Sequence, residues 1–542
     1  MPKLTAAHAL VNSIRAHGVD TVFGLPGVQL DGLFNALWDE RDSLRVIESR
    51  HEQGVAYMAF GYAQSTGKVG TFAVVPGPGV LNAGSALATA YACNAPVLCL
   101  TGQIPSAQIG RGLGLLHEIP HQLEVLRGLT KWCTRVDHGI GASDAVREAF
   151  RQLRSGRRRP VAIEMAMDVM HAEQELALTG PAPDEPPAAP DPDQIEAAAK
   201  LLGNAKAPLI VAGGGAIGGE EALQALAETL QAPVSMWRSG RGLLSDRHDL
   251  GVTQPVGHAF WGEADVVLAV GTRLQQQRMG WGTNGLKIVN INIDPHDINA
   301  LGRPEIGIVA DAPTALAALA DAVPKHNATR SDGVQAVRER KAQFQAAYEQ
   351  QLAPQMAYLK AMRDALPDDG FFIEDLTQVG YVCRFGFPIY QPRTMLNSGY
   401  QGTLGHSLAT GLGVKVANPD RAVLSISGDG GLMFVVQELA TAAKHGIAAV
   451  HVVFNDNAYG NVQRMQVEDY GGKVIASDLQ NPDFVKLAES FGVLGLRAES
   501  PDALRSSLET AFGHGGPVLV EVPMGKMPSP WEFIALGRNR PA

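Results

Sequence analysis

Short apolar runs rich in Val, Ile and Leu recur along the chain and alternate with longer segments of helical periodicity. In the first third of the chain these runs lie at residues 21–25, 70–75 and 95–101. Each run ends in turn residues, as at Pro26-Gly27 and Gly102-Gln103. Apolar strands that end in turns and alternate with helices are typical of a parallel sheet with helices on both faces. The pattern therefore predicts an α/β fold with doubly wound parallel sheets.

The same pattern occurs in three successive units. A proline-rich segment between Gly180 and Gln194 can form neither a helix nor a central strand, so we interpret it as a linker. A polar segment at residues 324–333 separates the second unit from the third. Each unit has an ordinary domain size. We predict an N-terminal domain at residues 1–172, a central Rossmann-like domain at 194–324 and a C-terminal domain at 335–542.

The stretch from Leu424 to Gly460 carries the clearest chemical signal. It predicts a strand, a glycine turn, a helix and a second strand, with Asp429 after the first strand and Asp456 after the second. Because the carboxyl ends of parallel strands share one edge of a sheet, the two carboxylates should converge there. Gly430 and Gly431 leave N–H groups at the helix start able to face an anion.

Oxygen ligands beside such a helix start, with no His or Cys in the turns themselves, indicate Mg²⁺ bridging a diphosphate. The alternative is an ordinary βαβ unit whose GDGG sequence is only a tight turn; the NDNAYG sequence at matching spacing favours the metal site. The glycine-rich turn from Gly213 to Gly219 resembles a nucleotide fingerprint. On its own it is also typical of a Rossmann-like domain with a structural role.

Composition narrows the class of partner. A formal net charge of −10 and a pI near 5.8 argue against nucleic acid or an anionic membrane as the main partner. No run approaches the roughly 20 apolar residues of a membrane span, and no signal sequence is evident. The four cysteines lack metal-binding or secreted-protein spacing. We therefore expect a soluble cytoplasmic protein, and we interpret the basic run from Arg157 to Arg159 as a solvated loop.

Glu52 lies between the apolar run that ends at Ile47 and a helical segment, where an acid commonly complements the helix dipole. The sequences that accompany it indicate a more specific role. The run from Leu44 to Pro105, the sequence SGYQGTLGHSLATGLG and the GDGG and NDNAYG turns closely resemble thiamine-diphosphate-dependent enzymes. The resemblance is to the superfamily of acetolactate synthase and 2-oxo acid decarboxylases, including benzoylformate decarboxylase. It covers all three units, and implies a pyrimidine-binding N-terminal and a diphosphate-binding C-terminal domain.

The resemblance implies roles for individual residues. Glu52 would hydrogen-bond N1′ of the cofactor's aminopyrimidine and relay protons. Leu404 would support the bent conformation of the cofactor, and the Gly402 carbonyl would bind its 4′ nitrogen. The Mg²⁺ ligands would be Asp429, Asp456 and the carbonyl of Ala458, and further cofactor contacts would come from Gln378, Val379, Gly430, Gly431 and Tyr459. Because active sites of this family form between two chains, a homodimer or homotetramer is implied.

Several positions depart from the family pattern. Asp456 stands where asparagine is common, and brings an extra carboxylate toward a diphosphate. His406 follows Leu404 where other members carry a different run. Val28 and Val75 stand where decarboxylases of aromatic oxo acids often carry serine and histidine. His117 lies in a loop where related members carry glutamine near the active site; a catalytic and a surface role are both open. Weaker pocket candidates are Gln29, Gln103 and His121.

We therefore predict a transferase or lyase that uses thiamine diphosphate and Mg²⁺. It would decarboxylate a small 2-oxo acid and ligate the product to a carbonyl acceptor, like acetolactate synthase. The alternatives are a non-ligating decarboxylase of the benzoylformate or pyruvate type, a 2-hydroxyacyl-CoA lyase-like enzyme, a flavin-dependent oxidase and a non-catalytic thiamine-binding protein. FAD or ADP in the central domain is possible but not favoured. Residues 271–277 depart from the flavin-contacting segment of acetolactate synthases, which argues against FAD. The substrate and the choice between dimer and tetramer stay open.

Overall fold

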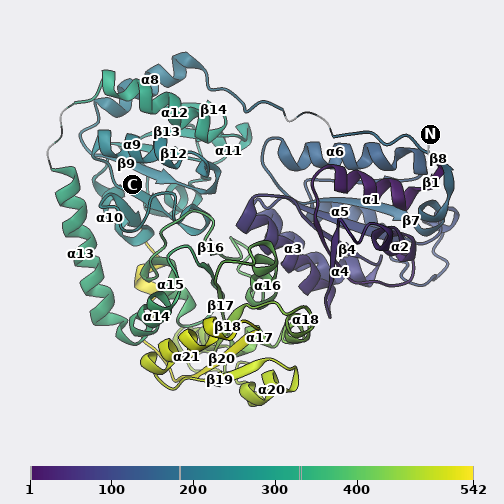
Figure 1. Cartoon of the computed structure of the whole chain (residues 1–542). Helices are drawn as coiled ribbons and strands as arrows, with labels where there is room; N and C mark the ends of the chain where they lie inside the picture. Colours follow the sequence, from purple (N-terminus) through teal and green to yellow (C-terminus); the bar gives the residue numbers. More distant parts are fainter. Residues whose placement is uncertain (1–2, 182, 184, 329, 331, 541–542) are drawn as a thin grey trace.

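The computed structural model describes residues 3–181, 183, 185–328, 330 and 332–540. Its described part contains three six-stranded sheets, one in each predicted unit (Figure 1). Every pair of neighbouring strands in these sheets is parallel. Helices cover the sheets on both faces. The predicted α/β class with three doubly wound sheets is confirmed.

The strands follow in their order across each sheet. The N-terminal sheet consists of β3 (Arg45–Glu48), β2 (Thr21–Gly24), β4 (Gly70–Val74), β5 (Val97–Gln103), β7 (Val161–Ala166) and β6 (Trp132–Val136). The central sheet consists of β11 (Gly251–Thr253), β10 (Val234–Met236), β9 (Pro208–Ala212), β12 (Val266–Val270), β13 (Lys287–Asn292) and β14 (Ile306–Val309). The C-terminal sheet consists of β16 (Met395–Leu396), β15 (Phe371–Ile373), β17 (Val423–Gly428), β18 (Val450–Asn455), β20 (Val518–Pro523) and β19 (Leu494–Arg497). An antiparallel pair, β1 (Lys3–Thr5) and β8 (Glu173–Glu175), joins the two ends of the first unit.

The helices divide among the three units in the same way. The first unit contains α1 (Ala6–Ala16), α2 (Asp31–Asp39), α3 (Glu52–Thr66), α4 (Pro78–Ala92), α5 (Gln122–Leu129), α6 (Ala142–Arg154) and α7 (Met167–His171). The second contains α8 (Pro192–Gly203), α9 (Glu220–Leu230), α10 (Gln254–Glu263), α11 (Pro295–Asn299) and α12 (Ala312–Ala322). The third contains α13 (Gly333–Gln351), α14 (Ala353–Ala365), α15 (Gly380–Gly386), α16 (Ser407–Ala417), α17 (Asp429–Leu432), α18 (Glu438–His445), α19 (Gly460–Glu468), α20 (Phe484–Ser490) and α21 (Pro501–His514).

The predicted helix after β17 is interrupted. The structure has a single turn, α17, then a non-helical segment, then α18. In this segment the N–H groups of Phe434 and Val435 bond to carbonyls three residues back, which is the pattern of a tight turn. The interruption leaves Met433 and Phe434 pointing outward, 43% and 50% exposed.

Helices α3 and α16 connect the first and third units. Both are buried over most of their length, and their apolar residues belong to one core cluster that reaches both sheets. A Cβ on Gly61 of α3 would lie 2.2 Å from the Thr410 carbonyl oxygen of α16, and one on Gly413 would lie 2.0 Å from the Met58 carbonyl oxygen. The two backbones can therefore touch only because these positions are glycine.

The predicted linkers include residues 182, 184, 329 and 331, which lie outside the described residues. The long helix α13 runs from the central to the C-terminal unit (Figure 1). Within the described ranges no helix has the length and apolar character needed to cross a membrane.

Candidate active site

Asp429 and Asp456 lie side by side at the carboxyl edge of the C-terminal sheet. Asp429 begins α17 directly after β17, and Asp456 follows β18. The two strands are parallel neighbours in register, with Gly428 opposite Phe454, so their carboxyl ends coincide. The two carboxyl groups are close enough for the charge of Asp429 to act on Asp456. The structure thus brings together the two acids that the strand spacing predicted to converge.

The electrostatics of this pair are those of two acids in contact. Burial and the neighbouring Asp429 carboxylate raise the pKa of Asp456 to about 6. Burial also raises the pKa of Asp429, which is 1% exposed, although hydrogen bonds from the Gly430 N–H and from Asn481 act against it. A cation between the carboxylates would favour the charged form of both, so the pair fits a metal ligand set.

The Ala458 carbonyl adds a third oxygen to this set. Ala458 forms a β-bridge with Asp478, and the Leu479 N–H donates to the Asn457 carbonyl at 2.8 Å, so the turn has a fixed backbone. Carboxylate and carbonyl oxygens suit a hard cation such as Mg²⁺. No group of three or more His, Cys, Asp or Glu side chains in the described ranges could hold a metal. A metal at Asp429 and Asp456 therefore needs carbonyl or ligand oxygens as well.

Two amide side chains hold the acids in place. Asn481 Nδ2 donates to Asp429 Oδ2 at 2.6 Å and to Asn455 Oδ1 at 3.0 Å, which ties the ends of β17 and β18 together. Gln378 Nε2 donates to Asp456 Oδ2 at 2.7 Å. Gln378 Oε1 accepts from the Met527 N–H at 2.7 Å, so both ends of this amide are bonded within the chain.

The turn after β15 has less freedom to bind a cofactor than its sequence suggests. The Val379 side chain is fully buried, and its N–H donates to Thr377 Oγ1 at 3.1 Å. The Gly380 N–H donates to the same hydroxyl at 2.8 Å. The Val379 carbonyl accepts from the N–H groups of Val382 at 3.0 Å and Cys383 at 3.1 Å, so the backbone groups of Val379 are bonded within the chain, and Gln378 already contacts Asp456.

The Gly402 to Leu404 turn lies against the glycines of α17. Gly402 has a φ of +58° and Gly405 a φ of +75°, both in the left-handed region. Asp375 Oδ2 accepts from the Gly405 N–H at 3.0 Å and fixes the turn at the end of β15. A Cβ on Gly431 would lie 3.4 Å from Leu404 Cδ1. The ring of Tyr459 covers the neighbouring Gly430 at 2.5 Å from such a Cβ. Leu404, both glycines and Tyr459 thus share one surface with Asp429.

Glu52 is the first residue of α3, at the carboxyl edge of the N-terminal sheet. Asn82 Nδ2 of α4 donates to Glu52 Oε2 at 3.0 Å. The proton-relay role implied for Glu52 calls for apolar surroundings, but its own chain leaves Glu52 only half-buried. Among the described residues no hydrogen bond or ion pair joins Glu52 to Gly402, Asp429 or Asp456. The turn that carries Gly402 does contact the first unit, because Thr403 Oγ1 bonds with Thr89 Oγ1 of α4 at 2.9 Å.

His117 lies near the N-terminal half. Its carbonyl oxygen would be 2.3 Å from a Cβ on Gly77, the residue that caps α4, which carries Asn82. His117 Nδ1 bonds with Gln29 Oε1 at 3.1 Å. Val75 is buried, whereas Val28 is 51% exposed. His117 and Glu52 thus belong to one edge of the sheet.

Two buried groups near the halves have other roles. His406 is fully buried against Tyr57, and burial lowers its pKa, so it is neutral and packs between α3 and α16. Glu438 begins α18 and lies at the start of α3, where its Oε2 accepts from the Arg50 N–H at 3.3 Å. Burial raises the pKa of Glu438 to about 7. A Cβ on Gly54 would lie 2.4 Å from Glu438 Oε1.

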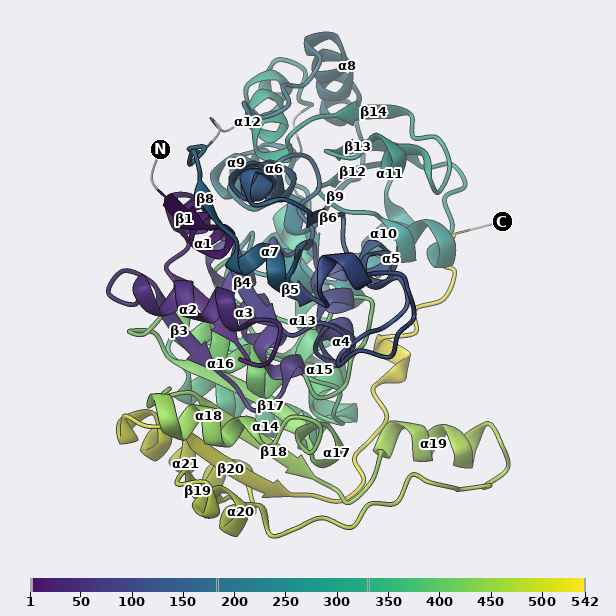
Figure 2. The ribbon, with the colours of Figure 1, turned by 90° about the vertical axis from the view of Figure 1, so that its right-hand side faces the viewer.

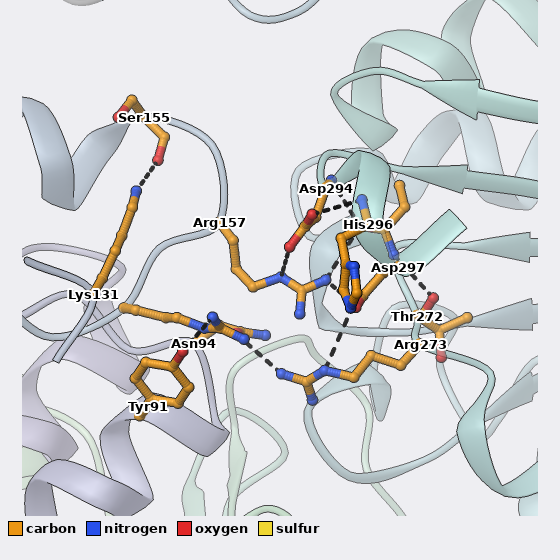
Figure 3. A network of polar contacts seen from close by, with 12 residues as sticks. Tyr91, Asn94, Lys131, Ser155, Arg157, Thr272, Arg273, Asp294, His296 and Asp297 are labelled. Carbon is orange, nitrogen blue, oxygen red and sulfur yellow. Dashed lines mark hydrogen bonds and ion pairs between the residues drawn. The ribbon is translucent and has the colours of Figure 1, made fainter. Parts of the chain in front are cut away.

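The prediction of a solvated Arg157 to Arg159 loop is wrong for two of its residues (Figure 3). Arg157 Nη2 pairs with Asp297, and its Nε lies 3.5 Å from Asp294 Oδ2, so it joins the first unit to the central one. Arg159 Nη1 donates to the Tyr91 hydroxyl at 2.7 Å. Only Arg158 is exposed. For Arg157 the reason is the placement of α11, because Asp297 in this helix and Asp294 at its N-cap face the loop. Arg159 instead contacts Tyr91 of α4.

The glycines of the central unit have a structural explanation. A Cβ on Gly213 would lie 2.5 Å from the Gly271 carbonyl, and one on Gly271 would lie 2.5 Å from the Ala216 nitrogen. The two turns therefore pack backbone against backbone. Arg273 lies beside them; its Nε is 3.8 Å from Asp297 Oδ2 and its Nη2 donates to Asn94 Oδ1 at 3.4 Å (Figure 3). Arg273 is thus already bonded to protein groups.

Sequence reasoning missed four polar residues that support the halves: Asn82, Asp375, Glu438 and Asn481. Each is distant in sequence from the residue it holds, as Asn481 is from Asp429. Their partners are set by sheet order and helix packing, so no local pattern marks them. Asp375 alone had a signal, because an acid directly after an apolar run lies at the same strand edge as Asp429.

Comparison with known proteins agrees with this geometry. Residues 4–125 match the N-terminal TPP binding domain of thiamine pyrophosphate enzymes, residues 195–319 their central domain and residues 375–522 their C-terminal TPP binding domain. The chain is 33% identical to a protein named probable 2-ketoarginine decarboxylase AruI of Pseudomonas aeruginosa, over 96% of this chain and 94% of the relative. It is 32% identical to a probable acetolactate synthase large subunit of Methanocaldococcus jannaschii, with 96% and 92% covered.

A third relative is the acetolactate synthase large subunit of Corynebacterium glutamicum, 30% identical over 99% of this chain and 89% of the relative. The identities and the coverage extend over all three sheets, as do the family matches. The chain belongs to the thiamine-pyrophosphate-dependent enzymes of the acetolactate synthase and 2-oxo acid decarboxylase superfamily.

Proposed function

We propose that the chain binds thiamine diphosphate through Mg²⁺, decarboxylates a 2-oxo acid and joins the remaining acyl unit to a second carbonyl compound. The observation that carries this proposal is the Asp429 and Asp456 pair beside the Gly402 to Leu404 turn. Oxygen ligands for a hard cation thereby adjoin a tightly packed glycine surface on which a cofactor can lie. The relatives named acetolactate synthase support the ligating reaction.

Bound thiamine diphosphate supplies a thiazolium that accepts the electrons released when a carboxylate leaves as CO₂. Asp429, Asp456 and the Ala458 carbonyl would hold Mg²⁺ and, through it, the diphosphate. The Leu404 side chain, in contact distance of the Gly431 position, would orient the two rings of the cofactor. The Glu52 carboxyl would hold a proton at the N1′ position of the pyrimidine, and Asn82 orients this carboxyl.

The site would be completed by a second copy of the chain. Large apolar side chains are exposed at the edges of both halves, which is unusual for a monomer surface. On the N-terminal half they are Val28, Leu81, Leu113 and Leu116; on the C-terminal half they are Met433, Phe434, Val462, Met465 and Ile475. Helix α19 and the loop after it project from the body of the chain (Figure 2), and no residue of α19 is buried. A partner that covers both edges would also bury Glu52.

A direct test is to incubate the protein with thiamine diphosphate, Mg²⁺ and a panel of 2-oxo acids, with and without acceptor carbonyl compounds, while CO₂ and products are followed by mass spectrometry. We expect CO₂ release together with a ligated hydroxyketone product. CO₂ with only an aldehyde product would favour the second candidate, a non-ligating decarboxylase. That candidate is supported by the relative named 2-ketoarginine decarboxylase, so the panel should include a cationic 2-oxo acid.

The remaining rivals differ in cofactor. A flavin-dependent oxidase would carry FAD, which is visible as absorbance near 450 nm in the purified protein at roughly the level of one flavin per chain. A 2-hydroxyacyl-CoA lyase-like enzyme would be stabilised by ADP or CoA, because a ligand that binds only the folded state raises the melting temperature. The proposed function would be refuted if the protein turned over no 2-oxo acid and showed either FAD absorbance or a melting temperature raised by ADP or CoA.

A further inference from the structure

We propose that Gln29 is a positioning residue that fixes the ring orientation and tautomer of His117, so that Nε2 of His117 is the atom that exchanges a proton with the substrate. The inference rests on the proposed function for the identity of the substrate. The similarity to known enzymes does not assign this pair of side chains, which come from two separate loops. Gln29 follows β2, and His117 lies in the long loop between β5 and α5.

The backbone of both residues is held in an uncommon conformation. Gln29 has a φ of +74° and His117 a φ of +65°, although neither is glycine. Each carbonyl oxygen then packs against a strand-end glycine. A Cβ on Gly102 would lie 2.1 Å from the Gln29 oxygen, and one on Gly77 would lie 2.3 Å from the His117 oxygen. Non-glycine residues in the left-handed region are costly and gather at functional sites.

The hydrogen bonds of Gln29 determine the tautomer of His117. Gln29 Nε2 donates to the Leu116 carbonyl oxygen at 2.7 Å, and a carbonyl can only accept. The amide oxygen must therefore face His117, where it accepts from Nδ1 at 3.1 Å. Nδ1 carries the proton in both charge states, and the neutral ring has its lone pair on Nε2. A partner on one ring nitrogen that sets the role of the other is the arrangement found in catalytic histidines.

A second amide anchors the far end of the same loop. Gln122 is buried at the start of α5. Its Oε1 accepts from the Gly77 N–H at 2.7 Å, and its Nε2 donates to the Gly102 carbonyl at 3.1 Å and to Glu164 Oε2 at 2.8 Å. The buried Glu164 carboxylate is paired with Arg135 Nε at 2.5 Å and fixes which end of the Gln122 amide faces it. The loop that carries His117 is thus pinned at the two glycines that His117 and Gln29 contact.

Three titratable groups surround the pair. Asp31 Oδ2 accepts from the Gln29 N–H at 3.2 Å, and Glu118 Oε2 accepts from the Leu115 N–H at 2.9 Å, so both carboxylates are bonded to backbone. His121 is exposed and caps α5 without a side-chain bond. No other described side chain bonds to the ring of His117. Among side chains, Gln29 is therefore its orienting partner.

The proton step is simple. Cationic His117 donates the Nε2 proton to a substrate oxygen as negative charge develops there; the N–H electron pair stays on the ring and the O–H bond forms. Water at the exposed loop returns the proton to Nε2. Such transfer typically contributes about 10²-fold to 10⁴-fold to rate, and much of it depends on orientation.

The test compares Gln29→Leu, Gln29→Glu, His117→Gln and a matched control. The control is Gln64→Leu, whose amide also donates to a carbonyl, that of Cys93 at 3.1 Å. We expect Gln29→Leu to lower kcat/KM about tenfold to hundredfold while thiamine diphosphate affinity changes less than about twofold. His117→Gln should remove the alkaline limb of the pH profile, where the wild type loses activity as the cationic ring gives up its proton. Gln29→Glu should move that limb to higher pH by about one unit, because a carboxylate beside Nδ1 stabilises the cationic ring.

A readout without turnover separates this inference from the proposed function. Diethyl pyrocarbonate acylates the unprotonated ring nitrogen, and mass spectrometry gives the rate at His117 as a function of pH. The midpoint should be higher in Gln29→Glu than in the wild type by about one unit. An unchanged midpoint would overturn the pairing, even if the wild type turned over no 2-oxo acid. Equal losses of kcat/KM in Gln29→Leu and Gln64→Leu, or an alkaline limb that survives in His117→Gln, would overturn the role in proton exchange.

Discussion

The charge of Asp456 decides how this site behaves without its metal. The pKa of Asp456 rises from 3.8 to about 6, mainly through burial and then through Asp429. An acid with a raised pKa in the folded state binds its proton more tightly there than when unfolded. Stability of the metal-free protein is therefore lost as the pH rises from about 4 to about 6.

Asp456→Asn should remove this loss of stability at high pH and keep an oxygen ligand. We expect the metal-free variant to melt at a higher temperature than the wild type at pH 8 and at a similar temperature near pH 4, in the presence of EDTA. Cofactor binding, followed by quenching of intrinsic fluorescence, should persist in Asp456→Asn. The affinity for Mg²⁺ should be roughly tenfold lower, because the ligand set loses one negative charge. Cofactor binding should vanish in Asp429→Ala. Equal loss of binding in the two variants would contradict the ligand assignment.

Glu438 gives the stability of the protein a second dependence on pH, which does not involve the metal. Burial raises its pKa from 4.5 to about 7, against donors from the Arg50 N–H and the Thr441 hydroxyl. The shift corresponds to about 3 kcal/mol at most, lost as the pH rises from about 4.5 to about 7. Glu438→Gln should reduce the fall in melting temperature between pH 5 and pH 8. The exposed Glu489→Gln should not, and an unchanged fall in Glu438→Gln would show that Glu438 is not the source.

At the scale of elements, the crossing of α3 and α16 controls the separation of the two halves. Glu52 begins α3, and α16 follows the Leu404 turn. Because the Thr410 carbonyl occupies the space of a Cβ on Gly61, Gly61→Ala must push the helices apart. We expect a loss of about 2 kcal/mol in the free energy of unfolding and weaker cofactor binding.

The control for this prediction is Gly128→Ala in α5, where nothing lies within 4 Å of the new Cβ and φ is not positive. That variant should be neutral or slightly stabilising, because alanine favours helix more than glycine does. Denaturant unfolding of both variants measures the difference. A Gly61→Ala protein as stable as Gly128→Ala would show that the close approach is not needed.

The same crossing shows how far local pattern reaches. The strands β2, β4, β5, β17 and β18 and the turns that follow them could be predicted, because each is a short apolar run that ends in glycine, proline or an acid. The convergence of Asp429 and Asp456 followed from the parallel order of two neighbouring strands. The break between α17 and α18 could not, since residues 432–436 are all apolar and carry no turn residue. Contacts such as Glu438 with the start of α3 depend on packing between units, which no local window contains.

At the scale of the whole molecule, the prediction of a solvated loop from Arg157 to Arg159 was wrong because it too depends on packing between units. Its partners, Asp294 and Asp297, lie on α11 of another unit, and only the arrangement of the three units brings them together (Figure 3). The half-burial of Glu52 has the opposite cause. The apolar surroundings that its proposed role needs are not supplied by its own chain, which supports the proposed site shared with a partner.

If each site takes Glu52 from one chain and Asp429 from another, two inactive variants should restore activity when mixed. Glu52→Gln and Asp429→Ala would each be inactive alone, because every site in either homodimer lacks one group. In a mixed dimer one site carries both substitutions and the other carries neither. Random exchange of subunits makes about half of the dimers mixed, so activity should recover to about a quarter of the wild-type level, measured as CO₂ release after refolding or co-expression at equal amounts. A mixture of Glu52→Gln with Asp456→Ala should behave alike, whereas a mixture of Asp429→Ala with Asp456→Ala should stay inactive, since no pairing of these two chains yields an intact metal site. No recovery in the first mixture would show that the two halves meet within one chain, and recovery in the last would show that Asp429 and Asp456 do not serve the same site from one chain.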